Sequence, residues 1–188
     1  MILNNMQKEI EVKAKVSDFQ SVRNQLEQFG CIFSEPIRQE DDVFVNFDGD
    51  FTQLKLGANF LRIRKENKAG KTRILFTLKQ SQTNELDCIE KETEITDAEQ
   101  FEGALLLMGY HKAISVYKTR TKTKYKEMEI CLDEVDQLGS FIEVEKITEG
   151  EGNDVQEELF SFLETLGVKR EDRVINGYDT LMYRHNNA

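Results

Sequence analysis

The chain has 188 residues, of which 35 are acidic and 25 are basic, so its formal net charge at pH 7 is −10. A hydrophobic content of 39% and a single proline exclude a disordered, collagen-like or low-complexity chain. The acidic balance argues against a protein that binds along a nucleic-acid backbone. Three separated cysteines give no disulfide framework and no zinc site, and no apolar window resembles a signal peptide or a membrane span. We therefore expect a cytoplasmic protein without nucleic-acid or membrane partners.

The first two elements differ in their hydrophobic period. Residues 8–16 alternate apolar and charged side chains, which predicts a strand with one apolar and one charged face. Residues 19–29 change to a helical period, for which Ser17 or Asp18 is a suitable N-cap and Gly30 a suitable end.

The middle of the chain is rich in strand patterns. We expect strands at 41–47, 60–64, 73–79 and 88–95. Gly49 and Gly57 indicate an exposed connection after the first of these strands. The polar turn at 67–71 predicts a hairpin between the second and the third.

The second half repeats this grouping of a helix and several strands. Thr96 and Glu99 form a candidate capping box for a helix that ends at Gly109. We expect strands at 116–123, 127–133 and 141–147, a helix at 154–166, and helical turns within 178–183. Runs of strands joined by short turns favour an α+β fold in which a few helices cover an antiparallel sheet. No linker divides the chain, so we expect a single domain over residues 1–188.

Charged side chains occupy the polar face of nearly every predicted strand, often in pairs two residues apart. One such face is usually the solvated side of a half-buried sheet, but here few Ser, Thr, Asn or Gln residues are mixed in. The carboxylates are Glu9, Glu11, Glu90, Glu92, Glu129, Asp133, Glu143 and Glu145, and the basic residues are Lys13, Arg62, Arg64, Lys79, Lys118 and Arg120.

If the sheet closes into a barrel with its apolar face outward beneath the helices, this charged face lines the lumen. Charges buried there must neutralise one another or a bound ion. A polyphosphate held by Lys and Arg, with one or two divalent cations held by the Glu pairs, would satisfy both signs. Carboxylates at Glu-x-Glu spacing lie about 6.5 to 7 Å apart, which suits a hard cation better than zinc.

Other catalytic patterns are absent from the sequence. His111 and His185 are isolated, which is typical of surface or packing histidines. No GxGxxG, Walker A, GxSxG or HExxH motif occurs, which argues against a Rossmann enzyme, a P-loop NTPase, a serine hydrolase and a zincin.

The order of the charged strands resembles that of the CYTH superfamily, the triphosphate tunnel enzymes that include class IV adenylyl cyclases, thiamine triphosphatases and inorganic tripolyphosphatases. EIEVK at 9–13 is similar to the ExExK motif of this family, and the resemblance extends over residues 7–183. The other matching segments are LRIR at 61–64, TLK at 77–79, the acidic strand at 90–94, KTR at 118–120, LDEV at 132–135 and FIEVE at 141–145. ExExK alone is a weak signal, but six matches in the same order are a strong one.

The resemblance implies a closed antiparallel eight-stranded β-barrel with helices packed outside, a triphosphate in its lumen, and Mg²⁺ or Mn²⁺ as cofactor. The implied metal ligands are Glu9, Glu11, Asp133, Glu143 and Glu145. The implied substrate-binding residues are Lys13, Arg62, Arg64, Lys79, Lys118 and Arg120. Glu90 and Glu92 are the catalytic candidates.

Three functions remain open at this point. The compact length and the segment at 107–111 resemble class IV adenylyl cyclases, which convert ATP to cyclic AMP and pyrophosphate. The alternative is a triphosphatase that hydrolyses thiamine triphosphate, a nucleoside triphosphate or inorganic tripolyphosphate. A polyphosphate-binding module without catalysis is a third hypothesis, although binding alone needs bases more than Glu pairs. A homodimer is compatible with each of the three.

Overall fold

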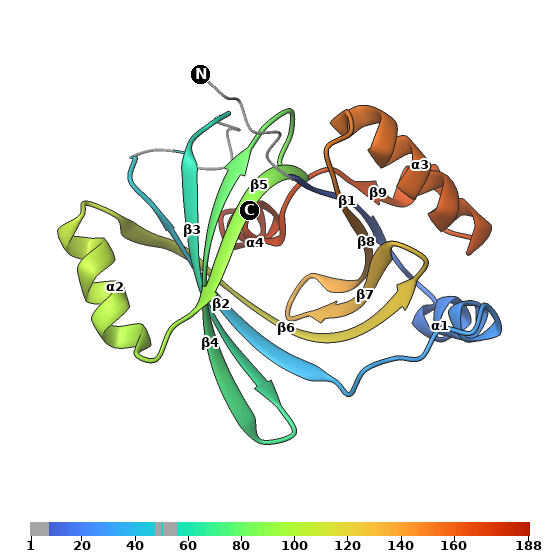
Figure 1. The fold of residues 1–188 in the computed structure, drawn as a ribbon, viewed down its shortest axis with the longest axis horizontal. Helices are drawn as coiled ribbons and strands as arrows, with labels where there is room; N and C mark the ends of the chain where they lie inside the picture. The colour runs from blue at the N-terminus through green and yellow to red at the C-terminus, as the bar shows by residue number, and fades with distance from the viewer. Residues whose placement is uncertain (1–7, 48–49, 51–55) are drawn as a thin grey trace.

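The computed structural model describes residues 8–47, 50 and 56–188, and these form nine strands and four α-helices (Figure 1). The strands are β1 Lys8–Lys15, β2 Ile37–Val45, β3 Asn59–Lys68, β4 Lys71–Ser81, β5 Asp87–Glu94, β6 His111–Tyr125, β7 Met128–Val135, β8 Gly139–Thr148 and β9 Arg173–Val174. The helices are α1 Phe19–Gln28, α2 Ala98–Leu107, α3 Gly152–Thr165 and α4 Tyr178–Asn186. None of the described helices is both long enough and apolar enough to cross a membrane.

The strands form one antiparallel sheet that closes on itself. Neighbouring strands follow in the order β5, β4, β3, β2, β6, β7, β8 and β1, and β1 also pairs with β5. The expected closed antiparallel eight-stranded barrel with helices outside is therefore confirmed. The short strand β9 pairs with β1 as well, with Arg173 opposite Ala14.

The barrel is apolar outside and charged inside because successive strand residues point to opposite faces. Outward side chains of β1, β7 and β8, such as Val12, Leu132 and Val144, form the main core with α1 and α3. On the opposite side of the barrel in Figure 1, α2 covers β3 and β4, where Ile63 and Leu105 pack in a second core. The inward face carries most of the charged strand residues, together with some apolar ones.

Helix α4 lies across one end of the barrel, behind the central opening in Figure 1. Its residues Tyr178 and Met182 pack against Val116, Val135 and Phe141. These three residues are at the inward-facing positions of β6, β7 and β8, in register with the charged residues further along each strand. The C-terminal segment therefore closes this end with apolar side chains.

Most predicted boundaries agree with the structure within a few residues, and the strands are generally longer than expected. The β3–β4 hairpin is confirmed, and its two turn residues Ala69 and Gly70 both have positive φ, 49° and 78°.

Asp18 caps α1 as expected. The Thr96 capping box is wrong, because Asp97 accepts the hydrogen bond at the start of α2. Gly57 lies in an exposed turn, whereas Gly49 lies outside the described residues.

Side chains reinforce the β1–β5 seam, whose ladder pairs two residues from each strand. The backbone N–H of Glu11 donates to the carbonyl of Leu86 at 2.9 Å. Gln156 of α3 is 4% exposed, and its Nε2 donates to the carbonyls of Glu11 at 3.1 Å and Leu86 at 3.3 Å. Its amide also exchanges hydrogen bonds with the side chain of Asn84. Helix α3 thus ties together the two chain segments that close the barrel.

We predict that Gln156→Leu lowers the free energy of unfolding by about 1 to 3 kcal/mol, since buried carbonyls lose their donor. Urea denaturation monitored by circular dichroism measures this change. Gln28→Leu is the matched control, because Gln28 is exposed at the end of α1 and its replacement should have little effect. Equal effects of the two substitutions would contradict the role of Gln156 at the seam.

Candidate functional site

The barrel encloses a cavity of about 410 Å³. Its wall contains every predicted site residue except Asp133. The predicted residues in the wall are Glu9, Glu11, Lys13, Arg62, Arg64, Lys79, Glu90, Glu92, Lys118, Arg120, Glu143 and Glu145. Strand alternation explains this result, because each of them lies at an inward-facing position. The structure brings the predicted residues together, and the role of each remains a prediction.

Three carboxylates on β1 and β8 form an acidic cluster, which consists of Glu9, Glu11 and Glu145. Glu145 lies opposite Glu11, and one carboxylate oxygen from each of the three residues lies within 4.8 Å of the others. Burial and the charge of Glu90 raise the pKa of Glu9 to about 7. Burial and the charge of Glu9 raise the pKa of Glu145 well above its usual range. A hard divalent cation relieves such repulsion, so these residues fit a Mg²⁺ or Mn²⁺ site.

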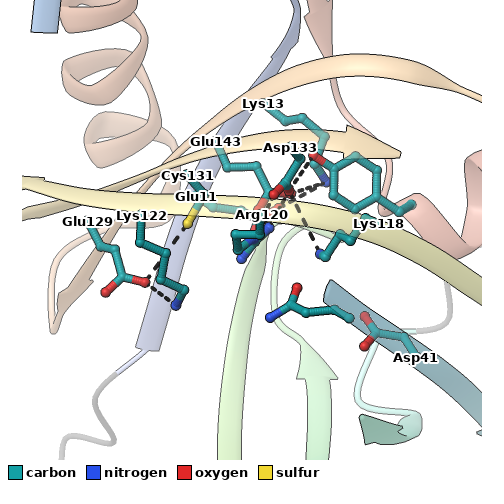
Figure 2. Close-up of polar contacts among 12 residues, drawn as sticks. Glu11, Lys13, Asp41, Lys118, Arg120, Lys122, Glu129, Cys131, Asp133 and Glu143 are labelled. Carbon is teal, nitrogen blue, oxygen red and sulfur yellow. Dashed lines mark hydrogen bonds and ion pairs between the residues drawn. The ribbon is translucent and has the colours of Figure 1, made fainter. Parts of the chain in front are cut away.

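Glu143, two residues before Glu145 on β8, is ion-paired within the protein. Its Oε1 lies 3.1 Å from Lys13 Nζ, and its Oε2 accepts a hydrogen bond from Arg120. Burial opposes ionisation, but these two cations hold the pKa of Glu143 well below its usual range. Figure 2 shows Glu143 among Lys13, Arg120 and Asp133.

Asp133 does not line the cavity and is fully buried. Its Oδ1 accepts a hydrogen bond from Arg120 Nε at 2.7 Å, and its Oδ2 accepts one from the hydroxyl of Tyr178 at 2.9 Å. Lys118 Nζ lies 3.8 Å from Asp133 Oδ2 (Figure 2). This geometry makes Asp133 an anchor for basic side chains, and its predicted role as a metal ligand stays a prediction.

The predicted basic residues of the cavity form what we call the basic wall, which consists of Lys13, Arg62, Arg64, Lys79, Lys118 and Arg120. Carboxylates neutralise part of this basic wall. Arg64 donates two hydrogen bonds to Asp41, Nε to Oδ1 at 2.6 Å and Nη2 to Oδ2 at 2.7 Å. Lys79 forms an ion pair with Glu90 across β4 and β5. Asp41 was not predicted as a site residue, although it lies two residues before Val43 on β2 and therefore shares the inner face with it.

Two other basic side chains are less fully neutralised. Arg62 donates through Nη2 to Thr77 at 3.0 Å and to Glu92 at 3.4 Å. Within the described part of the chain, its buried Nε has no hydrogen-bond partner. Burial and the nearby charge of Arg120 lower the pKa of Lys118 to about 8. An anion in the cavity would stabilise the charged form of Lys118 and could accept a hydrogen bond from Arg62.

A second group of possible ligands adjoins the acidic cluster. Glu129 and Cys131 of β7 lie within 4.8 Å of Glu145. Glu129 already forms an ion pair with Lys122, and burial raises the pKa of the Cys131 thiol (Figure 2). A protonated thiol is a poor ligand, so this group is less suited to a cation than the acidic cluster.

A closed barrel with an acidic cluster facing a basic wall defines a tunnel-type protein suited to a polyanion and a cation. The CYTH domain family matches residues 7–178, and the chain belongs to this family. Its members are generally metal-dependent enzymes with cyclase or triphosphatase activity, and they bind triphosphates such as ATP.

Known relatives cover nearly the whole chain. A Methanocaldococcus jannaschii protein named "putative adenylate cyclase" is 28% identical over 174 residues, covering 90% of this chain and 95% of the relative. The structure of PH1819 from Pyrococcus horikoshii has a TM-score of 0.80 and 26% identity, covering 94% of this chain and 99% of that chain. A Hippeastrum protein, described as a putative adenylyl cyclase with a dominant triphosphatase activity, has a TM-score of 0.62 and 19% identity, covering 96% of both chains. This last likeness shows the fold alone.

We predict that Glu9→Gln stabilises the metal-free protein at pH 8 by about 1 to 2 kcal/mol and much less at pH 5. The raised pKa of Glu9 favours the folded state at low pH, and this contribution is lost as the pH rises through about 7. Gln resembles the protonated carboxyl at every pH and avoids that loss. Urea denaturation in chelator at both pH values measures the difference.

The control for this prediction is Glu134→Gln, because Glu134 is an exposed residue of β7. Its replacement should change stability little at either pH. A Glu9→Gln effect that is the same at pH 5 and pH 8 would contradict the electrostatic description of the acidic cluster.

Proposed function

We propose that the protein is a metal-dependent enzyme that acts on a triphosphate bound in the barrel, with the conversion of ATP to cyclic AMP and pyrophosphate as its reaction. The observation that supports this proposal most is the coexistence in one cavity of an acidic cluster with raised pKa values and a basic side chain with a lowered one. Each sign of charge is incompletely neutralised. A triphosphate bound together with a divalent cation supplies both missing charges.

In this proposal the acidic cluster holds Mg²⁺ or Mn²⁺, with Glu143 and Asp133 as further candidate ligands. A divalent cation bound there supplies Lewis-acid polarisation of a phosphoryl oxygen. The chain itself provides the negative charge that attracts the cation and the rigid strands that fix Glu9, Glu11 and Glu145.

The basic wall binds and orients the phosphates. Arg62 and Lys118 have the least complete neutralisation and are proposed to contact phosphate oxygens directly. Arg64, Lys79, Arg120 and Lys13 complete the positive surface while carboxylates hold them in place. Charge-assisted contacts of this kind orient a phosphate as well as bind it.

Glu90 and Glu92 of β5 stay catalytic candidates, and they form ion pairs with Lys79 and Arg62 respectively. Lys79 lowers the pKa of Glu90 despite its burial, so Glu90 is ionised at neutral pH. Glu92 accepts hydrogen bonds from Arg62 and Thr77. We propose that both orient the basic side chains around the reacting phosphate.

Cyclase and triphosphatase chemistry differ in which phosphorus is attacked. In the cyclase the ribose 3′-hydroxyl attacks the α-phosphorus and expels pyrophosphate, whereas in the hydrolase water attacks the terminal phosphorus. The cavity wall also contains apolar side chains that suit a nucleobase, which supports ATP over inorganic tripolyphosphate: Ile37, Val43, Phe60 and Leu75. The triphosphatase remains the second candidate, because a structural neighbour from Hippeastrum is described with that activity.

The proposal places the enzyme in the cytoplasm, where the free thiols Cys31, Cys88 and Cys131 remain reduced. It includes a homodimer as a possible assembly. Fractionation of the native host and light scattering of the purified protein test these two points.

We predict that the protein incubated with ATP and Mn²⁺ or Mg²⁺ produces cyclic AMP and pyrophosphate in equal amounts. Anion-exchange chromatography of the products measures both. Orthophosphate from ATP, thiamine triphosphate or tripolyphosphate would instead assign the triphosphatase. Absence of turnover with all three compounds would support the non-catalytic binding module and contradict an enzyme.

We predict that Arg62→Ala weakens tripolyphosphate binding at least about tenfold, because a charge-assisted contact contributes roughly 1.5 to 3 kcal/mol. Isothermal titration calorimetry measures the dissociation constant directly. Lys65→Ala is the matched control, since Lys65 lies on the exposed face of the same strand. Similar dissociation constants for the two variants would show that the basic wall is merely solvated and does not bind the phosphates.

A further inference from the structure

Tyr178, the first residue of α4, is an aromatic side chain in the charged cavity wall. It is 7% exposed, and its ring contacts Phe141 edge to face with centroids 5.2 Å apart. The sequence analysis assigned this segment no function. Its position raises the question of what an aromatic ring does among so many charges.

The ring of Tyr178 contacts two of the predicted substrate-binding lysines. Lys13 Nζ lies 4.1 Å from the ring centroid, and Lys118 Nζ lies 4.7 Å from it. Both distances are within the range in which the negative face of an aromatic ring attracts a cation, and both lysines are buried. These lysines come from β1 and β6, so one ring from the C-terminal segment joins two separate parts of the barrel wall.

The hydroxyl group and Phe141 together restrain the ring in this position. The hydroxyl donates to Asp133 Oδ2 at 2.9 Å, and the same carboxylate accepts hydrogen bonds from Arg120. Asp133 is fully buried, so its position is well determined by these contacts. Phe141 restrains the ring at its edge.

We propose that Tyr178 is a positioning residue that holds the ammonium groups of Lys13 and Lys118 toward the cavity for contact with a bound polyphosphate. This inference rests on the proposed function and assigns a part of the binding wall to α4. The ring stabilises both cations without neutralising them, because it has no net charge.

The carboxylates near the two lysines explain why such a residue is needed. Lys13 Nζ lies 3.2 Å from Glu11 and 3.1 Å from Glu143, and Lys118 Nζ lies 3.8 Å from Asp133. Lys13 is thus already paired with two carboxylates, and the ring shares its charge with them. Without the ring, Lys118 would be free to move fully onto Asp133, and Lys13 would depend on its carboxylates alone. Phosphate binding would then have to break those ion pairs, which weakens affinity.

We predict that Tyr178→Leu weakens the binding of inorganic tripolyphosphate at least about tenfold, whereas Tyr178→Phe keeps it within about threefold of the wild type. Phe retains the ring over the two lysines and loses the contact with Asp133. Calorimetric titration with tripolyphosphate, with and without Mg²⁺, measures both variants. Tyr117→Leu and Tyr117→Phe are the controls, because Tyr117 is 39% exposed on β6 and should tolerate both changes.

A double-mutant cycle separates positioning from a general structural effect. In a Lys118→Ala background, Tyr178→Leu should reduce tripolyphosphate affinity by less than about threefold beyond the loss caused by Lys118→Ala. The reason is that one of the two lysines positioned by the ring is then absent. A merely structural role predicts the same additional loss in both backgrounds, and that result would overturn the inference.

A nearly isosteric pair of variants covers the case in which Tyr178→Leu does not fold. Replacing Tyr178 by phenylalanine or by 3,4,5-trifluorophenylalanine keeps the ring shape. In the second variant, fluorine removes the negative electrostatic potential at the face of the ring. We expect the fluorinated variant to bind tripolyphosphate at least about threefold more weakly than Tyr178→Phe, and equal binding by the two variants would overturn the proposal. If the wild type binds neither tripolyphosphate nor ATP, the proposed function itself fails. If the wild type binds tripolyphosphate and the folded Tyr178→Leu variant binds it equally well, only the positioning role of Tyr178 fails.

Discussion

Closure of the sheet between β1 and β5 encloses a strand face rich in charged side chains, and the rest of the structure depends on how those charges are neutralised. Ionised groups are costly to bury unless each has a partner. The apolar face is directed outward and covered by α1, α2 and α3, so the charged residues cannot turn to solvent without exposing the core. The barrel must therefore balance its own interior.

Most of this balance is internal. Arg64 with Asp41, Arg120 with Asp133, and Lys79 with Glu90 form ion pairs across neighbouring strands. What remains unbalanced is concentrated at two places, the acidic cluster and the part of the basic wall around Arg62 and Lys118. Replacing a buried ion pair by apolar residues is often neutral or stabilising, so stability alone does not explain so many charges. A cavity that binds a polyanion with a cation explains both unbalanced places together.

The local sequence predicts those features that depend on period two. Alternation in EIEVK at 9–13 places Ile10 and Val12 in the core and the charged residues inside, and the same rule predicts the inward faces of β3, β4, β6 and β8. The resemblance to the CYTH superfamily adds barrel closure, which no single strand reveals. The structure confirms this closure.

Other features depend on contacts between distant segments and have no local signal. Asp133 lies on the same strand face as Glu129, yet Arg120 and Tyr178 cover it, so that it does not line the cavity. Tyr178 itself belongs to a short helical segment, and nothing in the sequence of this segment indicates that it closes one end of the barrel. Gln156 likewise resembles any polar helix residue until α3 packs across the seam.

The central claim is that the acidic cluster and the basic wall bind one cation and one triphosphate together inside the barrel. Anomalous diffraction from crystals grown with Mn²⁺ and a non-hydrolysable ATP analogue tests this claim most directly. The account predicts a manganese peak at coordination distance from Glu9, Glu11 and Glu145, and phosphates in contact with Arg62 and Lys118. Manganese away from these carboxylates, or a nucleotide bound outside the barrel, would contradict it.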